Sequence, residues 1–330
     1  MAEYNGVLIC GELTEEKKVA HITLEMLGVG RKLAGDLKQD LSVVVMGSEV
    51  GSTAPELIAF GAEKVYLLDN PLLQEYQPDF YVTALERLCN EMMPYIVLLG
   101  QTSMGQDVAP RLAFRLSTLL TTDCIDLAID PETRLLLKTK MVYGNNALAV
   151  YVSEAKPQMA TVRAKAMLPP GRDDARKGEV IPFDSRLDAS LLRTEVVERV
   201  EVGEGVRLED ADVVVSGGRG IGSAAGFEQL KELSRLLGGA TGATRVACDQ
   251  GWVPTTWQVG LTGKIVSPDL YIAVGISGAS QHLAGISGAK KIVAINKDPK
   301  ANIFRVADYG VVGNYEEVIP AFKHALEEII

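Results

Sequence analysis

A glycine-rich turn in the second half of the chain contains residue types that can bind phosphate. Residues 216–222 read SGGRGIG, follow a β-branched run and lead into a segment of helical periodicity. Glycines at a strand-to-helix turn let backbone amides approach a phosphate, and the helix N-terminus adds positive potential. Arg219 lies in this turn, where a guanidinium can make bidentate contacts to phosphate. The turn therefore predicts a phosphate site; the alternative is a tight turn that binds nothing.

The same turn also matches a dinucleotide-binding signature. Gly220, Gly222 and Ala225 satisfy the pattern G-x-G-x-x-A, and Asp249 ends the next predicted strand, where an acidic residue would bind a ribose. An isolated match of this kind is a weak signal for a nicotinamide cofactor. It leaves an NAD-dependent oxidoreductase open as an alternative function.

A second turn and an intervening loop extend the predicted site. Residues 275–282 read GISGASQH and again join a strand to a helix, so two anion-binding turns predict an extended ligand with a pyrophosphate. Residues 258–264 read QVGLTGK, whose glycines and hydroxyl suit a loop that folds over a planar ring. Asn296 ends a later predicted strand, and ligands of open α/β sheets bind beyond the carboxyl ends of the strands.

His282 is one of three histidines in the chain and begins a predicted helix among small residues. A helix N-terminus disfavours an imidazolium unless an anion lies close, so we predict ligand contact for His282 rather than core packing. Trp252 and Trp257 either line the planar ring or fill a core, and both interpretations stay open. No H-E-x-x-H motif occurs and the four cysteines form no C-x-x-C pair, so we predict no metal site.

Alternating strands and helices must position these residues. In the second half, β-branched runs alternate with helical periods, which predicts a doubly wound parallel α/β domain of about 125 residues. Its strands are predicted at residues 212–216, 244–248, 271–276, 291–296 and 310–312, and its helices at 224–237, 280–285 and 316–330.

The first half predicts a mixed α/β domain with a largely parallel sheet. Strands at 7–10, 41–46, 64–68 and 95–100 are separated by helical segments, as parallel crossovers require. Four further strands then follow without helices, which predicts an antiparallel excursion that closes the domain, at 123–129, 134–142, 147–152 and 158–163.

Residues 168–207 are rich in proline, glycine and charge, which is typical of a segment that crosses between domains. We place the first domain at 1–190, the linker at 191–207 and the second domain at 208–330. The fold class is therefore α/β in both domains.

Composition limits the possible partners. The 330 residues are 47% hydrophobic, and 43 acidic against 33 basic residues give a net charge of -10, which repels nucleic acid. No apolar run approaches the ~20 residues that span a bilayer, so we expect no membrane insertion. The unpaired spacing of Cys10, Cys89, Cys124 and Cys248 favours a reducing cytoplasm.

Residues 217–313 resemble the α subunit of electron-transfer flavoproteins. The runs that carry the resemblance are GGRG at 217–220, GATR at 242–245, QVGLTGK at 258–264, SPDLYIAVGISGASQHLAG at 267–285, VAINKDP at 293–299 and VADYGVVG at 306–313. Looser similarity continues in the first domain at 99–102, 109–113, 122–124 and 161–165.

The resemblance implies an electron carrier without a substrate of its own. Its second domain would bind FAD, and its first domain would form the interface with a β subunit that walls the other side of the flavin. The implied donors are acyl-CoA dehydrogenases, as in fatty acid β-oxidation, or other flavin dehydrogenases, and the implied acceptor is a membrane-bound quinone oxidoreductase. Simple relay and flavin-based bifurcation both stay open, as does the second nucleotide, AMP or FAD, of the β subunit. A non-redox nucleotide-binding module is a further alternative.

The resemblance also implies residue roles. Arg219 and residues 277–282 would approach the pyrophosphate and ribityl chain, and Asn296 and Asn314 the adenosine end. Arg245 would lie by the isoalloxazine ring, Thr262 near N5, and His282 at the N1 and C2 carbonyl edge. The complete implied FAD site is Arg219, Thr244, Arg245, Gln258, Val259, Gly260, Leu261, Thr262, Gly275, Ser277, Gly278, Ala279, Ser280, Gln281, His282, Asn296, Asn314 and Tyr315.

Three positions depart from the family pattern. Thr244 stands where serine is common and keeps the hydroxyl. Leu261 stands where glutamine is common and removes an amide from the 258–264 loop. Asn314 stands where aspartate is common and removes a charge near the adenosine end.

Overall fold

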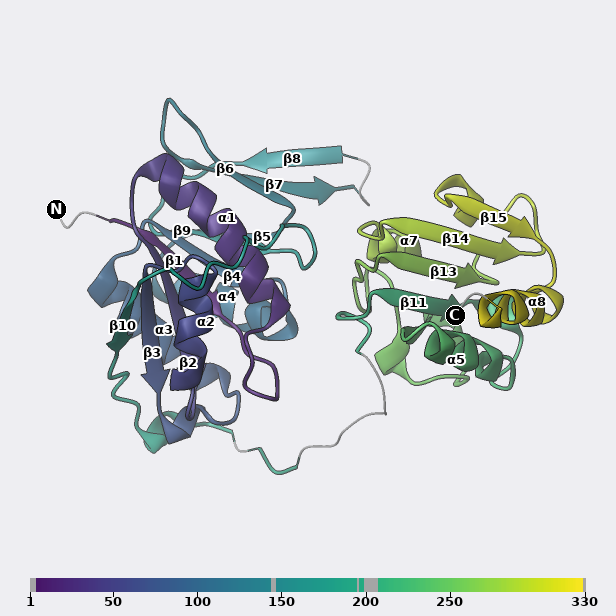
Figure 1. Ribbon diagram of the computed structural model, residues 1–330, viewed down its shortest axis with the longest axis horizontal. Coiled ribbons are helices and arrows are strands. Elements are labelled where there is room, and N and C mark those ends of the chain that lie inside the picture. The colour runs from purple at the N-terminus through teal and green to yellow at the C-terminus, as the bar shows by residue number, and fades with distance from the viewer. Residues whose placement is uncertain (1–3, 144–146, 195, 199–206, 329–330) are drawn as a thin grey trace. The chain divides into compact units, whose positions relative to one another are not determined.

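A computed structural model describes residues 4–143, 147–194, 196–198 and 207–328 (Figure 1). The chain forms two compact units that meet in the sequence near residue 200. Each unit has its own parallel sheet with helices on both faces. This arrangement confirms the predicted fold class.

The first unit is built on a seven-stranded parallel sheet with the order β10-β3-β2-β1-β4-β9-β5. Helices α1 and α2 pack on one face of this sheet, and α3 and α4 on the other. Strands covered on both faces must be apolar throughout, and β1, β2, β4 and β9 are buried at every residue. The elements of the sheet are β1 (Val7–Gly11), α1 (His21–Leu37), β2 (Leu41–Gly47), α2 (Ala54–Ala59), β3 (Lys64–Asp69), α3 (Pro78–Met92), β4 (Ile96–Gly100), α4 (Ser103–Arg115), β5 (Leu120–Cys124), β9 (Gln158–Val162) and β10 (Glu179–Pro182).

The antiparallel excursion is smaller than predicted. It comprises only β6 (Asp126–Ile129), β7 (Leu136–Val142) and β8 (Ala147–Tyr151), which form a separate three-stranded sheet. The single strand predicted at 123–129 is wrong, because the run is interrupted at Ile125. Asp123, whose φ is 63°, lies in the irregular end of β5, and β6 begins at Asp126. The run at 158–163 returns as β9 to the parallel sheet, because its residues are buried between layers.

One strand lies inside the segment predicted to cross between domains. Residues of β10 pair in parallel with β3, and the amide of Phe183 continues the pairing to the Leu67 carbonyl. The strand was not predicted because the composition of 168–207 is rich in proline. Edge strands tolerate residues such as Pro182 that central strands exclude.

The second unit is a five-stranded parallel sheet with the order β12-β11-β13-β14-β15. Helices α5, α6 and α8 contribute to the core on one face and α7 to the core on the other. The strand order reverses between β11 and β13, and such a switch point is where open α/β sheets bind ligands. The elements are β11 (Val213–Gly217), α5 (Gly226–Leu236), β12 (Ala240–Ala243), α6 (Arg245–Asp249), β13 (Leu270–Val274), α7 (Ser280–Ile286), β14 (Lys291–Asn296), β15 (Tyr309–Val312) and α8 (Tyr315–Glu327).

The strand predicted at 244–248 is wrong. The second strand is β12, four residues earlier, and residues 245–249 form helix α6. The sheet ends there because Gly217, the last residue of β11, already pairs with Ala243. Asp249 therefore ends a helix rather than a strand, and it lies 3.4 Å from Arg245 in an ion pair. The positional argument for a ribose-binding acid no longer applies.

Candidate functional site

The two glycine turns lie against each other at the switch point. The amide of Gly218 donates to the Val274 carbonyl at 2.9 Å, and the amide of Gly220 donates to the Gly275 carbonyl at 3.0 Å. A Cβ on Gly218 would lie 2.4 Å from the Gly275 oxygen, and one on Gly220 would lie 2.8 Å from Gly275 Cα. Only glycine permits this approach, which brings both turns to one edge of the sheet.

Backbone amides of the second turn are available to an anion. Within the part of the chain that the structure describes, no acceptor is found for the amides of Ser277, Gly278, Ala279 and Ser280. Ser277, Ala279 and Ser280 are exposed. Arg219, the first residue of a short 3-10 turn after β11, is also exposed. Free amides and an exposed guanidinium at adjacent strand ends are groups that can bind phosphate.

The 258–264 loop is attached to the start of α7. The amide of Leu261 donates to the Gln281 carbonyl at 2.8 Å, and Gly285 approaches so closely that a Cβ on it would lie 2.4 Å from Gly260 Cα. The Gln258 side-chain amide donates to the Thr262 hydroxyl oxygen at 2.9 Å. Leu261 and Thr262 are themselves exposed. The loop is thus fixed at its base, while its tip faces outward.

His282 differs from the sequence-based expectation. Its side chain is 6% exposed, with Nδ1 3.0 Å from the Val259 carbonyl oxygen and Nε2 3.0 Å from the Tyr271 hydroxyl. Burial lowers the pKa of His282 to about 4, so the ring is neutral at pH 7. In this structure His282 is a packed core residue with both ring nitrogens bonded, because the Val259 and Tyr271 groups supply the partners that we expected from a ligand.

Thr244 and Arg245 lie at the carboxyl end of β12. The amide of Thr244 donates to the Gly217 carbonyl at 2.9 Å, which places the start of α6 next to the first glycine turn. The Arg245 side chain is 67% exposed and pairs with Asp249. The guanidinium is therefore held on the outside of the unit.

The remaining predicted site residues connect neighbouring strand ends. Asn296 donates through Nδ2 to the Ile276 carbonyl at 2.8 Å, so it ties the end of β14 to the second turn. Asn314 caps α8 by accepting from the Glu316 amide. The Tyr315 hydroxyl donates to the Ile221 carbonyl at 3.0 Å, which joins the start of α8 to the first turn. Both asparagine side chains thus have partners within the chain.

Tyr271 and Ser216 are both fully buried beneath the site, and neither side chain was assigned a role from the sequence. Their signal was a polar side chain within otherwise apolar runs, VVVSG and LYIAV. Trp252 and Trp257 are partly buried and pack against the core, which favours the core-filling interpretation of the two tryptophans.

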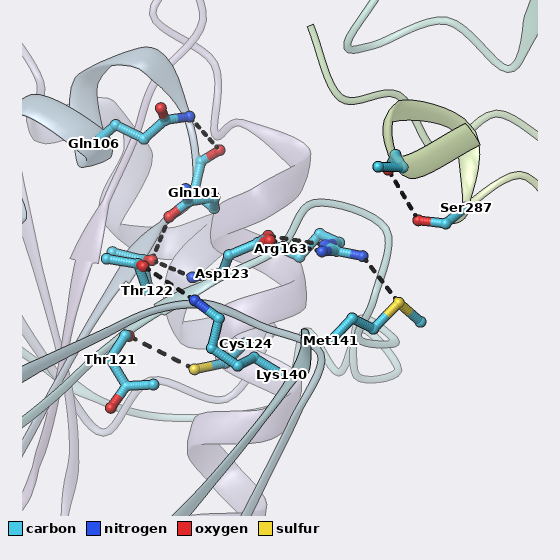
Figure 2. Close-up of polar contacts among 12 residues, drawn as sticks. Gln101, Gln106, Thr121, Thr122, Asp123, Cys124, Lys140, Met141, Arg163 and Ser287 are labelled. Atoms are coloured by element: carbon cyan, nitrogen blue, oxygen red, sulfur yellow. Dashed lines mark hydrogen bonds and ion pairs between the residues drawn. The ribbon is translucent and has the colours of Figure 1, made fainter. Parts of the chain in front are cut away.

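The first unit carries a polar network at the ends of its strands (Figure 2). Arg163 donates to both carboxylate oxygens of Asp123, from Nε at 2.8 Å and Nη2 at 2.6 Å. The Asp123 amide donates to the Thr161 hydroxyl oxygen at 2.8 Å, and that hydroxyl donates to Gln101 Oε1. The Arg163 side chain is 8% exposed, so the network fixes β5 and β9 rather than offering a free cation.

Two family models match the chain. The one described as "Electron transfer flavoprotein domain" matches residues 7–186, and "Electron transfer flavoprotein FAD-binding domain" matches residues 207–287. Both compact units are therefore covered in large part.

Curated relatives are similar over nearly the whole length. A protein of Thermoanaerobacterium thermosaccharolyticum described as "Electron transfer flavoprotein subunit alpha" is 46% identical over 100% of both chains. Proteins of the same description from Megasphaera elsdenii and Bacillus subtilis are 41% and 40% identical, over 99% and 98% of this chain and 98% of each relative. Among the helices of the described residues, none is long and apolar enough to cross a membrane.

Proposed function

This chain belongs to the electron-transfer flavoprotein family as an α subunit, and from that premise we propose that it carries electrons on an FAD held at the β11–β13 switch point. It takes no substrate of its own. The observation that carries the proposal is the pair of glycine turns that pack together at one sheet edge, with Arg219 and free amides beside them.

The residues of the switch point fit a flavin dinucleotide. Its two phosphates require an anion site, which Arg219 and the amides of residues 277–280 supply. Its planar ring needs an accessible surface to lie against, and the exposed tip of the 258–264 loop offers one. FAD provides the redox chemistry when bound. The protein orients it, and fixed positive charge near the ring, from Arg245, stabilises negative charge there.

Thr262 positions a hydroxyl at the tip of the loop. Because Gln258 donates to its oxygen, the hydroxyl hydrogen of Thr262 is left to donate outward. We assign this hydrogen to the ring edge near N5. Backbone hydrogen bonds hold the 258–264 loop and the start of α6 in place on this side of the site. The residues that make them are Thr244, Val259, Gly260 and Gln281.

The exposure of the site residues supports a second chain as the partner. Arg219, Arg245, Leu261 and Thr262 are all exposed, so the unit covers one side of a bound ring and leaves the other to solvent or to a second chain. We propose that a β subunit covers it and contacts the first unit. The domain division at 1–190, 191–207 and 208–330 belongs to this proposal.

The redox partners are proposed by class. Acyl-CoA or other flavin dehydrogenases supply the electrons, and a membrane-bound quinone oxidoreductase accepts them. Relay and bifurcation are distinguished by counting flavins, since one FAD per heterodimer fits relay and two fit bifurcation. A reducing cytoplasm is the proposed location, because all four cysteines are free and buried.

The NAD-dependent alternative is less well supported than the sequence suggested. Asp249, the residue expected to bind the ribose, lies on a helix and is paired with Arg245.

The proposed function is tested by co-expression with the β subunit, followed by gel filtration of the pair and of this chain alone. We expect the pair to retain FAD and the isolated chain to lose most of it. A colourless pair that binds NAD or AMP would contradict the proposed function, and a fully flavinated monomer would contradict the shared site.

A further inference from the structure

A buried tyrosine connects the core of the second unit to the 258–264 loop. Tyr271 in β13 is 0% exposed, and its hydroxyl lies 3.0 Å from His282 Nε2. Nδ1 of the same imidazole lies 3.0 Å from the Val259 carbonyl oxygen, near the base of the loop. Hydroxyl, imidazole and carbonyl therefore form one continuous line from the sheet to the loop.

The carbonyl determines where the protons lie along this line. A carbonyl oxygen only accepts, so Nδ1 of His282 carries a hydrogen and donates to Val259. Burial keeps the ring neutral at pH 7, so Nε2 carries no hydrogen and accepts instead. Tyr271 must then donate its hydroxyl hydrogen to Nε2. With this assignment both ring nitrogens are satisfied, and losing the tyrosine donor would leave a buried acceptor unpaired.

Two backbone hydrogen bonds also attach the loop to neighbouring elements near this point. The Val259 amide donates to the Ala243 carbonyl at 2.9 Å, and the Leu261 amide donates to the Gln281 carbonyl at 2.8 Å. Gly260 lies between these two bonds. Its φ of 147° is in the region that favours glycine, and its amide donates to the Lys264 carbonyl within the loop at 3.1 Å. The bond from His282 to the Val259 carbonyl is therefore one of the small number of bonds that attach this part of the loop to α7.

We propose that Tyr271 is a positioning residue for the 258–264 loop: its hydroxyl holds His282 in the orientation that grips Val259, and so determines where Leu261 and Thr262 lie. The proposal rests on the function proposed above, since the loop position matters because the FAD ring lies against it. Tyr271 itself touches no ligand. It acts through His282 and the backbone.

Ser216 provides a matched control. Its neighbour Val214 pairs with Tyr271 across β11 and β13, and residues two apart on a strand share a face, so Ser216 lies on the Tyr271 face of the sheet. Its buried hydroxyl interacts with the Tyr271 hydroxyl but makes no bond to Nε2 of His282. Ser216→Ala therefore removes a buried hydroxyl that neighbours Tyr271, while Tyr271 keeps the hydroxyl that donates to His282.

The test compares Tyr271→Phe with Ser216→Ala in the full chain bound to its β subunit. Hydrogen exchange is measured at the Leu261 amide. We expect exchange about tenfold faster in Tyr271→Phe, the size of one lost hydrogen bond, and within about twofold of the wild type in Ser216→Ala. Unchanged exchange in Tyr271→Phe, or equal acceleration in both variants, would overturn the proposal.

A second measurement keeps the proposal testable if Tyr271→Phe does not fold. The chain has three histidines, so ¹⁵N-histidine spectra of the wild type can be assigned with His21→Gln and His324→Gln. We expect His282 neutral with its hydrogen on Nδ1, and a hydrogen-bonded Nε2. A hydrogen on Nε2 would overturn the proposal. This spectrum does not require flavin, so failure of the proposed function, seen as a colourless wild-type pair, is distinguished from failure of the tyrosine's role.

Discussion

The Gly220 amide donates to the Gly275 carbonyl at 3.0 Å, so the turn after β11 rests directly on the turn after β13. The contact leaves no room for a side chain, because a Cβ on Gly220 would lie 2.8 Å from Gly275 Cα. Two segments more than 50 residues apart in the sequence thereby meet at one edge of the sheet, where we propose that the phosphates bind.

Gly220→Ala tests this contact. The added methyl must push the two turns apart, which costs about 1 to 3 kcal/mol of overpacking at the proposed phosphate site. We expect FAD affinity of the heterodimer to fall by about tenfold or more, measured by fluorescence titration. Gly171→Ala is the control, since nothing lies within 4 Å of that position. Equal affinities of the two variants would contradict the role of the packed turns.

Arg245 and Asp249 should shift the flavin potential in opposite directions. Arg245→Ala removes positive charge that favours the reduced ring, whereas Asp249→Asn removes the carboxylate that offsets it. Because both groups are exposed, about 0.5 to 1 kcal/mol is expected, or roughly 20 to 40 mV for one electron. Anaerobic titration of the heterodimer should show a lower first potential in Arg245→Ala and a higher one in Asp249→Asn. Shifts of the same sign would refute the assignment.

His282 should make the second unit less stable in acid. Its folded pKa of about 4 lies below the ordinary value of 6.5, so the unfolded chain binds the proton more readily between these values. Stability from the neutral buried ring is full above about pH 6.5 and is lost as the pH falls toward 4, by about 2 to 4 kcal/mol.

His282→Asn checks this pH dependence. Asparagine can still donate to the Val259 carbonyl but does not titrate. Urea unfolding at pH 7 and pH 4.5 should show a smaller loss of stability in the variant than in the wild type. Matching losses in the two proteins would mean that the imidazole does not titrate as described.

Lys138 in β7 should be replaceable with a gain in stability. It is 1% exposed, burial lowers its pKa, and no acidic side chain pairs with it among the described residues. Removing a buried, unpaired cation while keeping its aliphatic volume is often stabilising. Lys138→Met should raise the urea midpoint of the first unit, while Lys140→Met, at a half-buried position, should change it little. Destabilisation by Lys138→Met alone would show that the ammonium has a necessary partner.

Periodicity predicted the parallel sheets well because their strands are apolar on both faces. Lys291–Asn296 has the predicted bounds. The β12 prediction failed because strand ATGA is made of small residues with little strand signal, whereas the apolar Val246, Ala247 and Cys248 that follow belong to a helix.

The sequence predicted the glycine turns of the site, but it did not predict the buried contacts of His282 beneath them. Glycine turns are local features, so their sequence identifies them. The burial of His282 depends on Tyr271 and Val259, which reach it from separate segments, and no local pattern reports such a tertiary contact. The polar residue in an apolar strand was the one available signal.

Anaerobic electron transfer through the heterodimer tests the central claim most directly. A flavin dehydrogenase with its reducing substrate is added to the purified pair, and the absorbance of the flavin bound to the pair is followed before and after addition of an artificial acceptor. The account predicts stoichiometric bleaching of the FAD bound by this chain, followed by full recovery, and Arg219→Ala should lower the FAD content of the pair. A pair that retains FAD but is neither reduced nor reoxidised, or one whose FAD content is unaffected by Arg219→Ala and Gly220→Ala together, would contradict it.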